Sequence, residues 1–124
     1  MPARQLLSDD GRFHYRGGEL PLVADLAERA VRLSRAGLDA VPGLRGYVGV
    51  DLVLGNAADG SEDRLIEINP RLTTSYLGLR KLARFNLLQA LLDVVQGRSV
   101  ELQWNAGTVH FLLNSIAATI TTSA

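Results

Sequence analysis

Residues 45–69 read RGYVGVDLVLGNAADGSEDRLIEIN, and this stretch decides the fold. Two runs rich in Val, Leu and Ile, 45–54 and 64–69, flank a polar loop. Such a pattern is typical of two antiparallel strands joined as a β-hairpin. Pro70 ends the second strand, because proline has no amide hydrogen to donate to a neighbouring strand. We therefore predict a β-hairpin over 45–69.

The predicted hairpin carries its acidic residues on one face, because successive side chains of a strand alternate between its two faces. Pairing that is symmetric about Asp59 places Asp51 opposite Glu67. The same register places Gly49 opposite Asn69, although a bulge hidden in the long loop would change it. The other face belongs against a core and carries the apolar residues Val48, Val50, Leu52, Ile66 and Ile68.

The facing carboxylates of Asp51 and Glu67 call for a compensating charge, since like charges opposite each other destabilise a strand pair. Magnesium takes oxygen ligands from carboxylates, amides, water and substrate phosphates. Asn69 offers an amide oxygen and nearby Arg71 a positive charge, so this face is a candidate metal and phosphate site. Gly49 has no side chain to obstruct it. Isolated acidic residues on exposed strands commonly bind nothing, and spacing alone leaves both interpretations open.

Further strands and two helices are predicted on both sides of the hairpin. Apolar residues recur at helical spacing in both helices, and Gly37 and Gly97 suit their C-terminal ends. Gly17-Gly18 is expected to break the N-terminal strand pattern. The remaining expected strands are 4–7, 12–15, 100–104 and 108–113, and the helices run from about Pro21 to Ala36 and from about Ser75 to Gln96.

The fold class that follows is α+β, an antiparallel sheet that carries the hairpin, with the two helices packed on one face. A chain of 124 residues has room for one domain with a modest core. We expect that domain to span residues 1–118. Residues 119–124 are rich in Thr, Ser and Ala, and we expect them to form a flexible tail.

Composition excludes several classes of function. Thirteen basic and thirteen acidic residues give a net charge of zero, so the chain has little general attraction to nucleic acid or to anionic membranes. The absence of cysteine excludes disulfides and zinc–thiolate sites. No stretch approaches the roughly 20 apolar residues that span a bilayer, and no apolar leader is visible. We therefore expect a cytoplasmic protein without nucleic-acid or membrane partners.

The residues around the hairpin resemble one known family. Gly46 to Leu54, GYVGVDLVL, followed by Glu67 to Arg71, EINPR, is similar to the C-terminal core of the ATP-grasp superfamily. The continuation Leu72 to Leu79, LTTSYLGL, resembles the small ATP-grasp proteins similar to tyramine–glutamate ligase. The resemblance covers most of residues 4–115, and its specific part is 46–79. It implies the C-terminal half of an ATP-grasp fold.

The resemblance also implies a chemistry and a role for each matching residue. Asp51 and Glu67 would bind magnesium or manganese, with Glu67 bridging two ions, and Asn69 would be the third protein ligand. Arg71 would contact the transferred phosphate, whose charge suits the guanidinium fork. The implied reaction is ligation of a small carboxylate to an amine, in which ATP first converts the carboxylate into an acyl-phosphate.

The chain departs from the family pattern in its lysines. Its single lysine, Lys81, lies in a predicted helix after the metal motif, whereas the family supplies phosphate-binding lysines from an N-terminal subdomain. We therefore expect an incomplete ATP-grasp domain, which is either an excised fragment, a truncated gene product or one piece of a split protein, and this leaves open whether the chain is active alone. The alternative is a non-catalytic remnant that associates with itself, as a homo-oligomer, or with a partner chain.

Other polar residues carry weaker signals. His14 and His110 have no nucleophile near them in the sequence and are expected to be ordinary structural histidines. Residues 73–75 precede the second helix, where they either cap it or hold a substrate carboxylate or phosphate. The acidic loop 56–63 is expected to be a solvated turn, because it lacks the spacing of a calcium-binding loop.

Overall fold

The computed structural model describes residues 1–113 and 118–123. The chain forms two compact units, each built from separate stretches of sequence. The first, which we call the four-stranded unit, comprises Met1–Leu22, Thr74–Leu87 and Glu101–Ala124. The second, the hairpin unit, comprises Val23–Thr73 and Leu88–Val100. Both combine helix with antiparallel strands, so the predicted α+β class is confirmed, with two sheets where one was expected.

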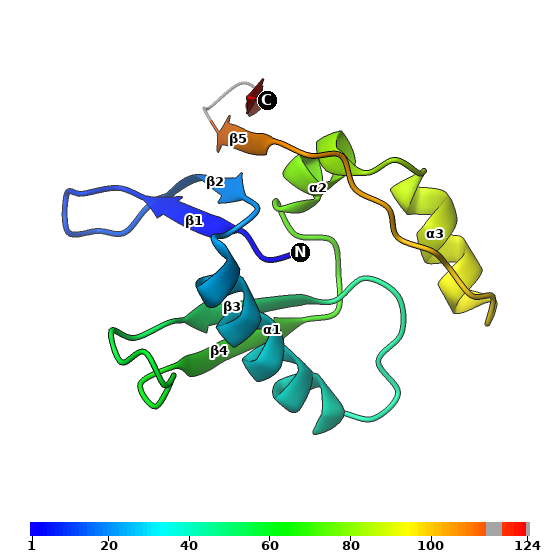
Figure 1. The fold of residues 1–124 in the computed structure, drawn as a ribbon, viewed down its shortest axis with the longest axis horizontal. Coiled ribbons are helices and arrows are strands. Elements are labelled where there is room, and N and C mark those ends of the chain that lie inside the picture. The colour runs from blue at the N-terminus through cyan, green and yellow to red at the C-terminus, as the bar shows by residue number, and fades with distance from the viewer. Residues whose placement is uncertain (114–117, 124) are drawn as a thin grey trace. The chain divides into compact units, whose positions relative to one another are not determined.

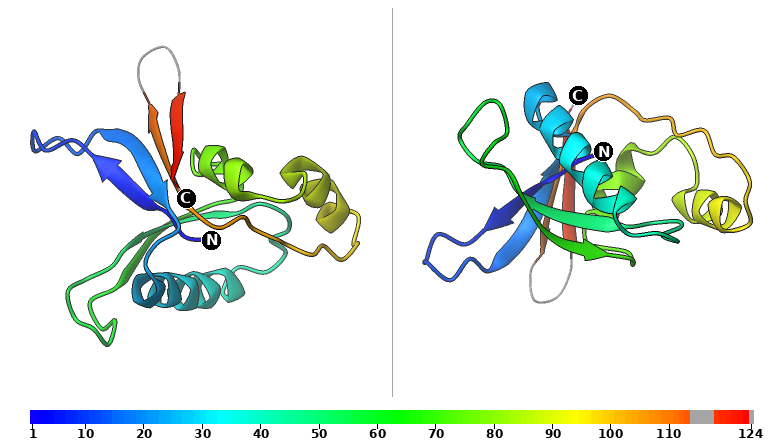
Figure 2. Two further views of the ribbon diagram at one scale, coloured as in Figure 1. Left: turned by 45° about the horizontal axis from the view of Figure 1, so that its top comes forward. Right: turned by 90° about the horizontal axis from the view of Figure 1, so that it is seen from below.

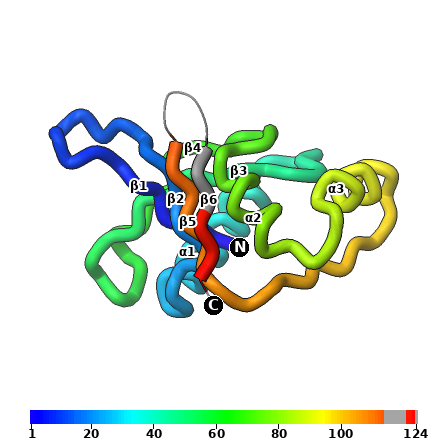
Figure 3. Tube along the Cα trace, turned by 90° about the horizontal axis from the view of Figure 1, so that it is seen from above, coloured from blue at the N-terminus to red at the C-terminus, as the bar shows by residue number. Residues whose placement is uncertain are grey.

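The four-stranded unit is an antiparallel sheet with one helix packed on it. Its strands are β1 (Arg4–Leu7), β2 (Tyr15–Leu20), β5 (Thr108–Leu113) and β6 (Ala118–Ser123), in the order β1-β2-β5-β6 (Figure 3). Helix α2 (Tyr76–Leu82) packs against β2 and β5. The core of this unit contains Leu79, which is 8% exposed, and four side chains that are at most 1% exposed, namely Leu20, Leu82, Val109 and Phe111.

The glycine pair Gly17-Gly18 lies inside β2, so the prediction that it breaks the strand is wrong. Both glycines are buried against Phe111 of the neighbouring strand. A Cβ at Gly17 would lie 2.0 Å from the carbonyl oxygen of Phe111, and one at Gly18 would lie 2.6 Å from its ring. The pair therefore provides room for close packing between β2 and β5, and the strand continues through it.

The hairpin unit contains β3 (Gly49–Val53) and β4 (Arg64–Asn69), which form an antiparallel pair. Helix α1 (Ala24–Asp39) lies across one face of this pair, as Figures 1 and 2 show. Most of α3 (Leu87–Val95) also belongs to this unit. The predicted central hairpin is thus confirmed.

Helix α1 begins and ends about three residues later than predicted. The predicted start at Pro21 is wrong because Leu22 still belongs to the four-stranded unit, where its amide donates to the Pro2 carbonyl at 3.3 Å. Gly37 lies within the helix and does not cap it. A Cβ at Gly37 would approach Leu65 Cδ1 to 2.1 Å, so this glycine allows the helix to pack closely on β4.

The long helix predicted over 75–96 is two helices, α2 and α3. Ala83 is extended, with ψ of 130°, and forms a single β-bridge with Trp104. The amides of Arg84 and Asn105 bond across the same bridge, to Gln103 and Leu82, at 3.0 and 2.7 Å. These hydrogen bonds between residues 82–84 and 103–105 replace helical ones, so α2 ends here. No Gly or Pro marks the break in the sequence.

Two smaller predictions near the C-terminus are also wrong. The strand expected over 100–104 is reduced to the bridge at Trp104. The tail expected over 119–124 is largely β6, which pairs in regular register with β5, while Ala124 lies outside the described residues. The many β-branched Thr residues favour a strand once a neighbour offers hydrogen bonds. In the described part of the chain, no helix is long and apolar enough to cross a membrane.

Candidate functional site

The register of the hairpin brings the predicted site residues together. Asp51 of β3 pairs with Glu67 of β4, and Gly49 pairs with Asn69. Both pairs match the register predicted from the symmetry of the sequence about Asp59. Side chains of directly opposite residues lie within reach of each other, so one cation can contact both carboxylates.

A bulge follows this pair and changes the faces of β4. Leu52 pairs with Leu65, so Ile66 is an extra residue on β4 between two ladder positions. Ile66 is 61% exposed, which contradicts its predicted place in the core, whereas Leu65 and Ile68 approach Gly37 of α1. The bulge turns Leu65 toward the helix and leaves Ile66 outside. The bulge shifts the ladder by one residue between Leu52–Leu65 and Asp51–Glu67, so that Asp51 lies opposite Glu67.

The three predicted metal ligands differ in exposure. Glu67 is exposed, Asp51 is half-buried and Asn69 is only 5% exposed. The Asn69 amide nitrogen faces the Asp51 carboxylate at 3.5 Å, which is the long limit of a hydrogen bond. Asn69 would have to turn its amide oxygen outward to share a cation with Asp51, and this weak contact is a small barrier to that rotation.

The site has too few side-chain ligands to hold a metal ion by itself. Within residues 1–113 and 118–123, no group of three or more His, Asp or Glu side chains is placed to hold a metal ion. Two carboxylates and one amide fit a hard cation that keeps water and takes further oxygens from a bound phosphate, as magnesium does. They do not fit zinc or copper, which favour nitrogen and sulfur ligands.

Arg71 lies just beyond β4 in a tight turn. Its amide donates to the Asn69 carbonyl at 2.8 Å, so the chain reverses direction directly after the last predicted ligand. The Arg71 side chain is exposed, and its Nη1 reaches only the Leu72 carbonyl, at 3.4 Å. The guanidinium can therefore move to an incoming anion without breaking a strong bond.

Sequence reasoning missed the residues that fix the loop of the hairpin. Arg29 of α1 binds Asp63 through an ion pair and donates to the Gly55 carbonyl at 2.8 Å. Asp63 also accepts from the Gly55 amide at 3.0 Å. The bond from Arg29 lowers the pKa of Asp63, and both side chains are almost buried. Separation in sequence hid this cluster, since Arg29 lies in α1 while Gly55 and Asp63 lie near the two ends of the hairpin loop.

The other acidic residues of the loop bind backbone amides. Glu62 accepts from Asn56 and Ala57 at 3.0 and 3.1 Å, and Asp59 accepts from Ser61 at 2.9 Å. These carboxylates order the loop. His110 lies 3.6 Å from Glu19 on the surface of the four-stranded unit, with no nucleophile among its described contacts.

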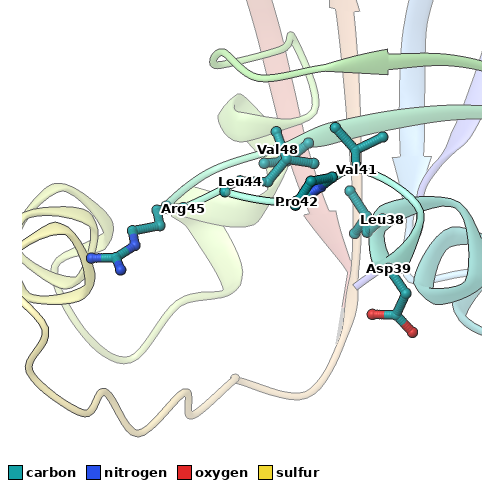
Figure 4. Close-up of a pocket in the computed structure, with 9 residues that line it drawn as sticks. Leu38, Asp39, Val41, Pro42, Leu44, Arg45 and Val48 are labelled. Atoms are coloured by element: carbon teal, nitrogen blue, oxygen red, sulfur yellow. The ribbon is translucent and has the colours of Figure 1, made fainter.

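A shallow cavity lies beside the hairpin, between the end of α1 and the start of β3. It measures about 440 Å³ and is lined by residues of the loop 38–48. Figure 4 shows Val41, Leu44 and Val48 near its centre, while the side chains of Asp39 and Arg45 point away from them. No charged pair converges on this cavity, so it adds nothing to the carboxylate site.

Residues 2–75 match the sequence profile of the ATP-grasp domain. This region includes the whole hairpin with its paired carboxylates. The chain belongs to the ATP-grasp family.

Two relatives of the genus Methanocaldococcus are similar to part of this chain. Tyramine–L-glutamate ligase of Methanocaldococcus jannaschii is 39% identical over 64 residues, 52% of this chain and 20% of that protein. The same enzyme of Methanocaldococcus fervens is 34% identical over 77 residues, 62% of this chain and 24% of that protein. The match thus spans about a quarter or less of the relatives' length. No solved structure gives a significant match.

Proposed function

We propose that this ATP-grasp chain provides the metal-binding half of a site that ligates a small carboxylate to an amine at the expense of ATP. The observation that carries the proposal is the direct pairing of Asp51 with Glu67, followed on the same strand end by Asn69 and Arg71. Facing carboxylates are unfavourable unless a cation offsets their repulsion. Their direct pairing in the ladder supports a cation as part of the working protein.

Each residue of the site has one task in this proposal. Asp51, Glu67 and Asn69 would hold magnesium, or manganese, which would also bind phosphate oxygens of ATP. The metal would neutralise the charge on the transferred phosphate. Arg71 binds the same phosphate, or the acyl-phosphate formed from the substrate carboxylate, through its guanidinium fork.

The class of substrates is proposed from the relatives, whose names describe a ligase that joins tyramine and L-glutamate. A small carboxylate that is activated by ATP and then attacked by an amine fits the same chemistry. The reaction needs ATP and magnesium, and the cytoplasm supplies both. The rest of the site would determine which acid and which amine are bound.

The proposed site needs a second part. The only lysine, Lys81, lies in α2 of the four-stranded unit, and other cations for the phosphates would have to be arginines or come from another segment or chain. The hairpin unit exposes Val53 by 55% and Ile66 by 61%, and such apolar residues are candidates for contact with that part. The same exposure favours the second candidate function, a self-associating remnant without catalysis.

Calorimetric titration of the chain with Mg·ATP tests the proposal. Glu67→Gln removes one charge from the site without changing its shape, so Mg·ATP affinity should fall by roughly tenfold or more. Glu28→Gln is the matched control, because Glu28 is an exposed carboxylate of the same unit, on α1.

Equal affinity of the wild type and Glu67→Gln would refute the metal role of this residue. A folded wild type that binds no Mg·ATP but forms a stable oligomer, measured by light scattering, would favour the self-associating remnant. Magnesium-dependent binding that only Glu67→Gln weakens supports the ligase.

A further inference from the structure

The segment after β4 leaves the hairpin and returns to it at the same place. Asn69, the last residue of β4, pairs with Gly49 in the ladder. Four residues later, the side chain of Thr73 packs on Gly49 itself, where a Cβ would come within 2.4 Å of Thr73 Cγ2. The three residues between them, which we call the Arg71 link (70–72), are therefore anchored at both ends on one residue of β3.

Tyr47 fixes the second anchor. Its hydroxyl lies 3.1 Å from Thr73 Oγ1 and forms a hydrogen bond with it. Tyr47 lies two residues before β3, and its hydroxyl reaches the same Thr73 side chain that packs on Gly49. Both hydroxyl-bearing side chains are half-buried, which favours a persistent bond over a solvent-exchanged one.

The Arg71 link has few other restraints. Pro70 limits one backbone angle, and the Arg71 amide bonds to Asn69 at the first anchor. Within residues 1–113 and 118–123, the guanidinium itself has only the long contact to the Leu72 carbonyl. The position of Arg71 over the hairpin is therefore set mainly by where the chain is held at Asn69 and at Thr73.

We propose that Tyr47 and Thr73 are positioning residues for Arg71. They hold the Arg71 link so that the guanidinium reaches a phosphate bound beside the Asp51–Glu67 pair. This inference rests on the proposed function, in which Arg71 binds phosphate. Gly49 takes part by leaving room for Thr73. Neither Tyr47 nor Thr73 needs to touch the nucleotide, because both act through the geometry of the Arg71 link.

A double-mutant cycle between Tyr47 and Arg71 tests the inference. Mg·ATP affinity is measured by calorimetry for the wild type, Tyr47→Phe, Arg71→Ala and the double variant. Tyr47→Phe should weaken binding by roughly three- to tenfold, the size expected for one lost hydrogen bond. In the Arg71→Ala background it should have almost no further effect, because the residue that it positions is gone.

Two further variants separate positioning from general loss of stability. Thr73→Val keeps the packing on Gly49 but removes the hydroxyl, so it should reproduce Tyr47→Phe. Tyr15→Phe is the matched control, because Tyr15 accepts an equivalent bond of 2.9 Å from Thr74 within the four-stranded unit. Tyr15→Phe should leave Mg·ATP affinity unchanged even where its thermal stability falls as much.

Amide hydrogen exchange of the ligand-free chain gives an independent readout. Tyr47→Phe should speed exchange at residues 71–73 and leave Asp51 and Glu67 unchanged. Unchanged exchange there, unchanged affinity, or additive effects of Tyr47→Phe and Arg71→Ala would each overturn the inference. If Arg71→Ala itself binds Mg·ATP as well as the wild type, the proposed role of Arg71 fails first, and the inference fails with it.

Discussion

At the scale of single residues, several glycines of this chain matter because they have no side chain. Gly17 lies where a side chain would collide with the backbone of the neighbouring strand, and its φ of 146° is rarely adopted by other residues. Gly49 makes room for Thr73 on the proposed site, although its own φ is not in the left-handed range. One glycine thus serves the sheet, and the other serves the site.

Gly17→Ala should destabilise the chain severely. The added Cβ meets the Phe111 carbonyl at 2.0 Å, and a backbone atom within a sheet cannot move aside as a side-chain end can. We expect a loss of roughly 3 kcal/mol or more in the free energy of unfolding, measured by urea denaturation.

Gly11→Ala is the matched control for this prediction. Gly11 also has a positive φ, 76°, but nothing lies within 4 Å of the position that a Cβ would occupy, so only backbone strain of about 1 kcal/mol applies. Similar losses for the two variants would mean that the close packing of β2 on β5 is not what requires Gly17.

The opposition of Asp51 and Glu67 was predicted correctly from the sequence, but the structure reaches it through the bulge at Ile66, because the ladder pairs next to the loop are not symmetric about Asp59. The sequence did not suffice for the glycines. Gly17 is required because Phe111 approaches it closely, and Gly37 because Leu65 does. Both of these partners lie in other elements. A local pattern treats a glycine as a break or a cap, since it contains no information on a distant neighbour.

At the scale of elements, the cluster of Arg29, Asp63 and Gly55 joins α1 to the loop end of the hairpin. Asp63 precedes β4 directly, and Gly55 follows β3, so the carboxylate bridges the two strands just beyond their last ladder pair. Arg29 adds bonds to both sides of that bridge. The cluster therefore restrains the loop end of the hairpin, while Asp51 and Glu67 form the middle pair of the ladder.

The stability of the hairpin unit should decrease in acid. The bond from Arg29 lowers the pKa of Asp63 in the folded chain, so the folded state favours the ionised carboxylate. Such a group contributes stability that is present above the pKa of the unfolded chain, about 3.9, and is lost as the pH falls through the lower folded value. Asp63→Asn should lower the thermal midpoint at pH 7 and reduce its dependence on pH below about 5.

Asp93→Asn serves as the comparison. Asp93 also has a lowered pKa, caused first by its bond from Arg98, but that ion pair is largely exposed. Exposed pairs contribute little because water and salt screen them. Thermal melts followed by circular dichroism should therefore show a smaller change for Asp93→Asn than for Asp63→Asn, and the opposite ranking would contradict the role given to the cluster.

Two features of the elements were beyond prediction from sequence. The bulge at Ile66 arises where Leu65 and Ile68 both turn toward α1, which the alternation of β4 alone cannot indicate. The break between α2 and α3 arises from hydrogen bonds with residues 103 and 105, while the intervening sequence has good helical periodicity. Tertiary bonds override local propensity in both cases.

At the scale of the whole molecule, the buried core is unevenly distributed. The four large side chains that are almost fully buried all belong to the four-stranded unit. In the hairpin unit, the hydrophobic side chains that are buried in the described structure are two alanines, Ala30 and Ala90. The proposed site thus lies on the unit with the smaller core. This distribution is in keeping with a site that is completed by a further part.

The central claim is that Asp51 and Glu67 hold a divalent cation, and paramagnetic broadening by manganese tests it most directly. Mn·ATP is added to the ¹⁵N-labelled 13.4 kDa chain, and the loss of amide signals is mapped along the sequence. The account predicts the strongest loss at Asp51, Glu67 and Asn69, and much less in the Glu67→Gln variant. Broadening centred on the acidic loop 56–63, or none at concentrations where Mn·ATP is in large excess, would contradict it.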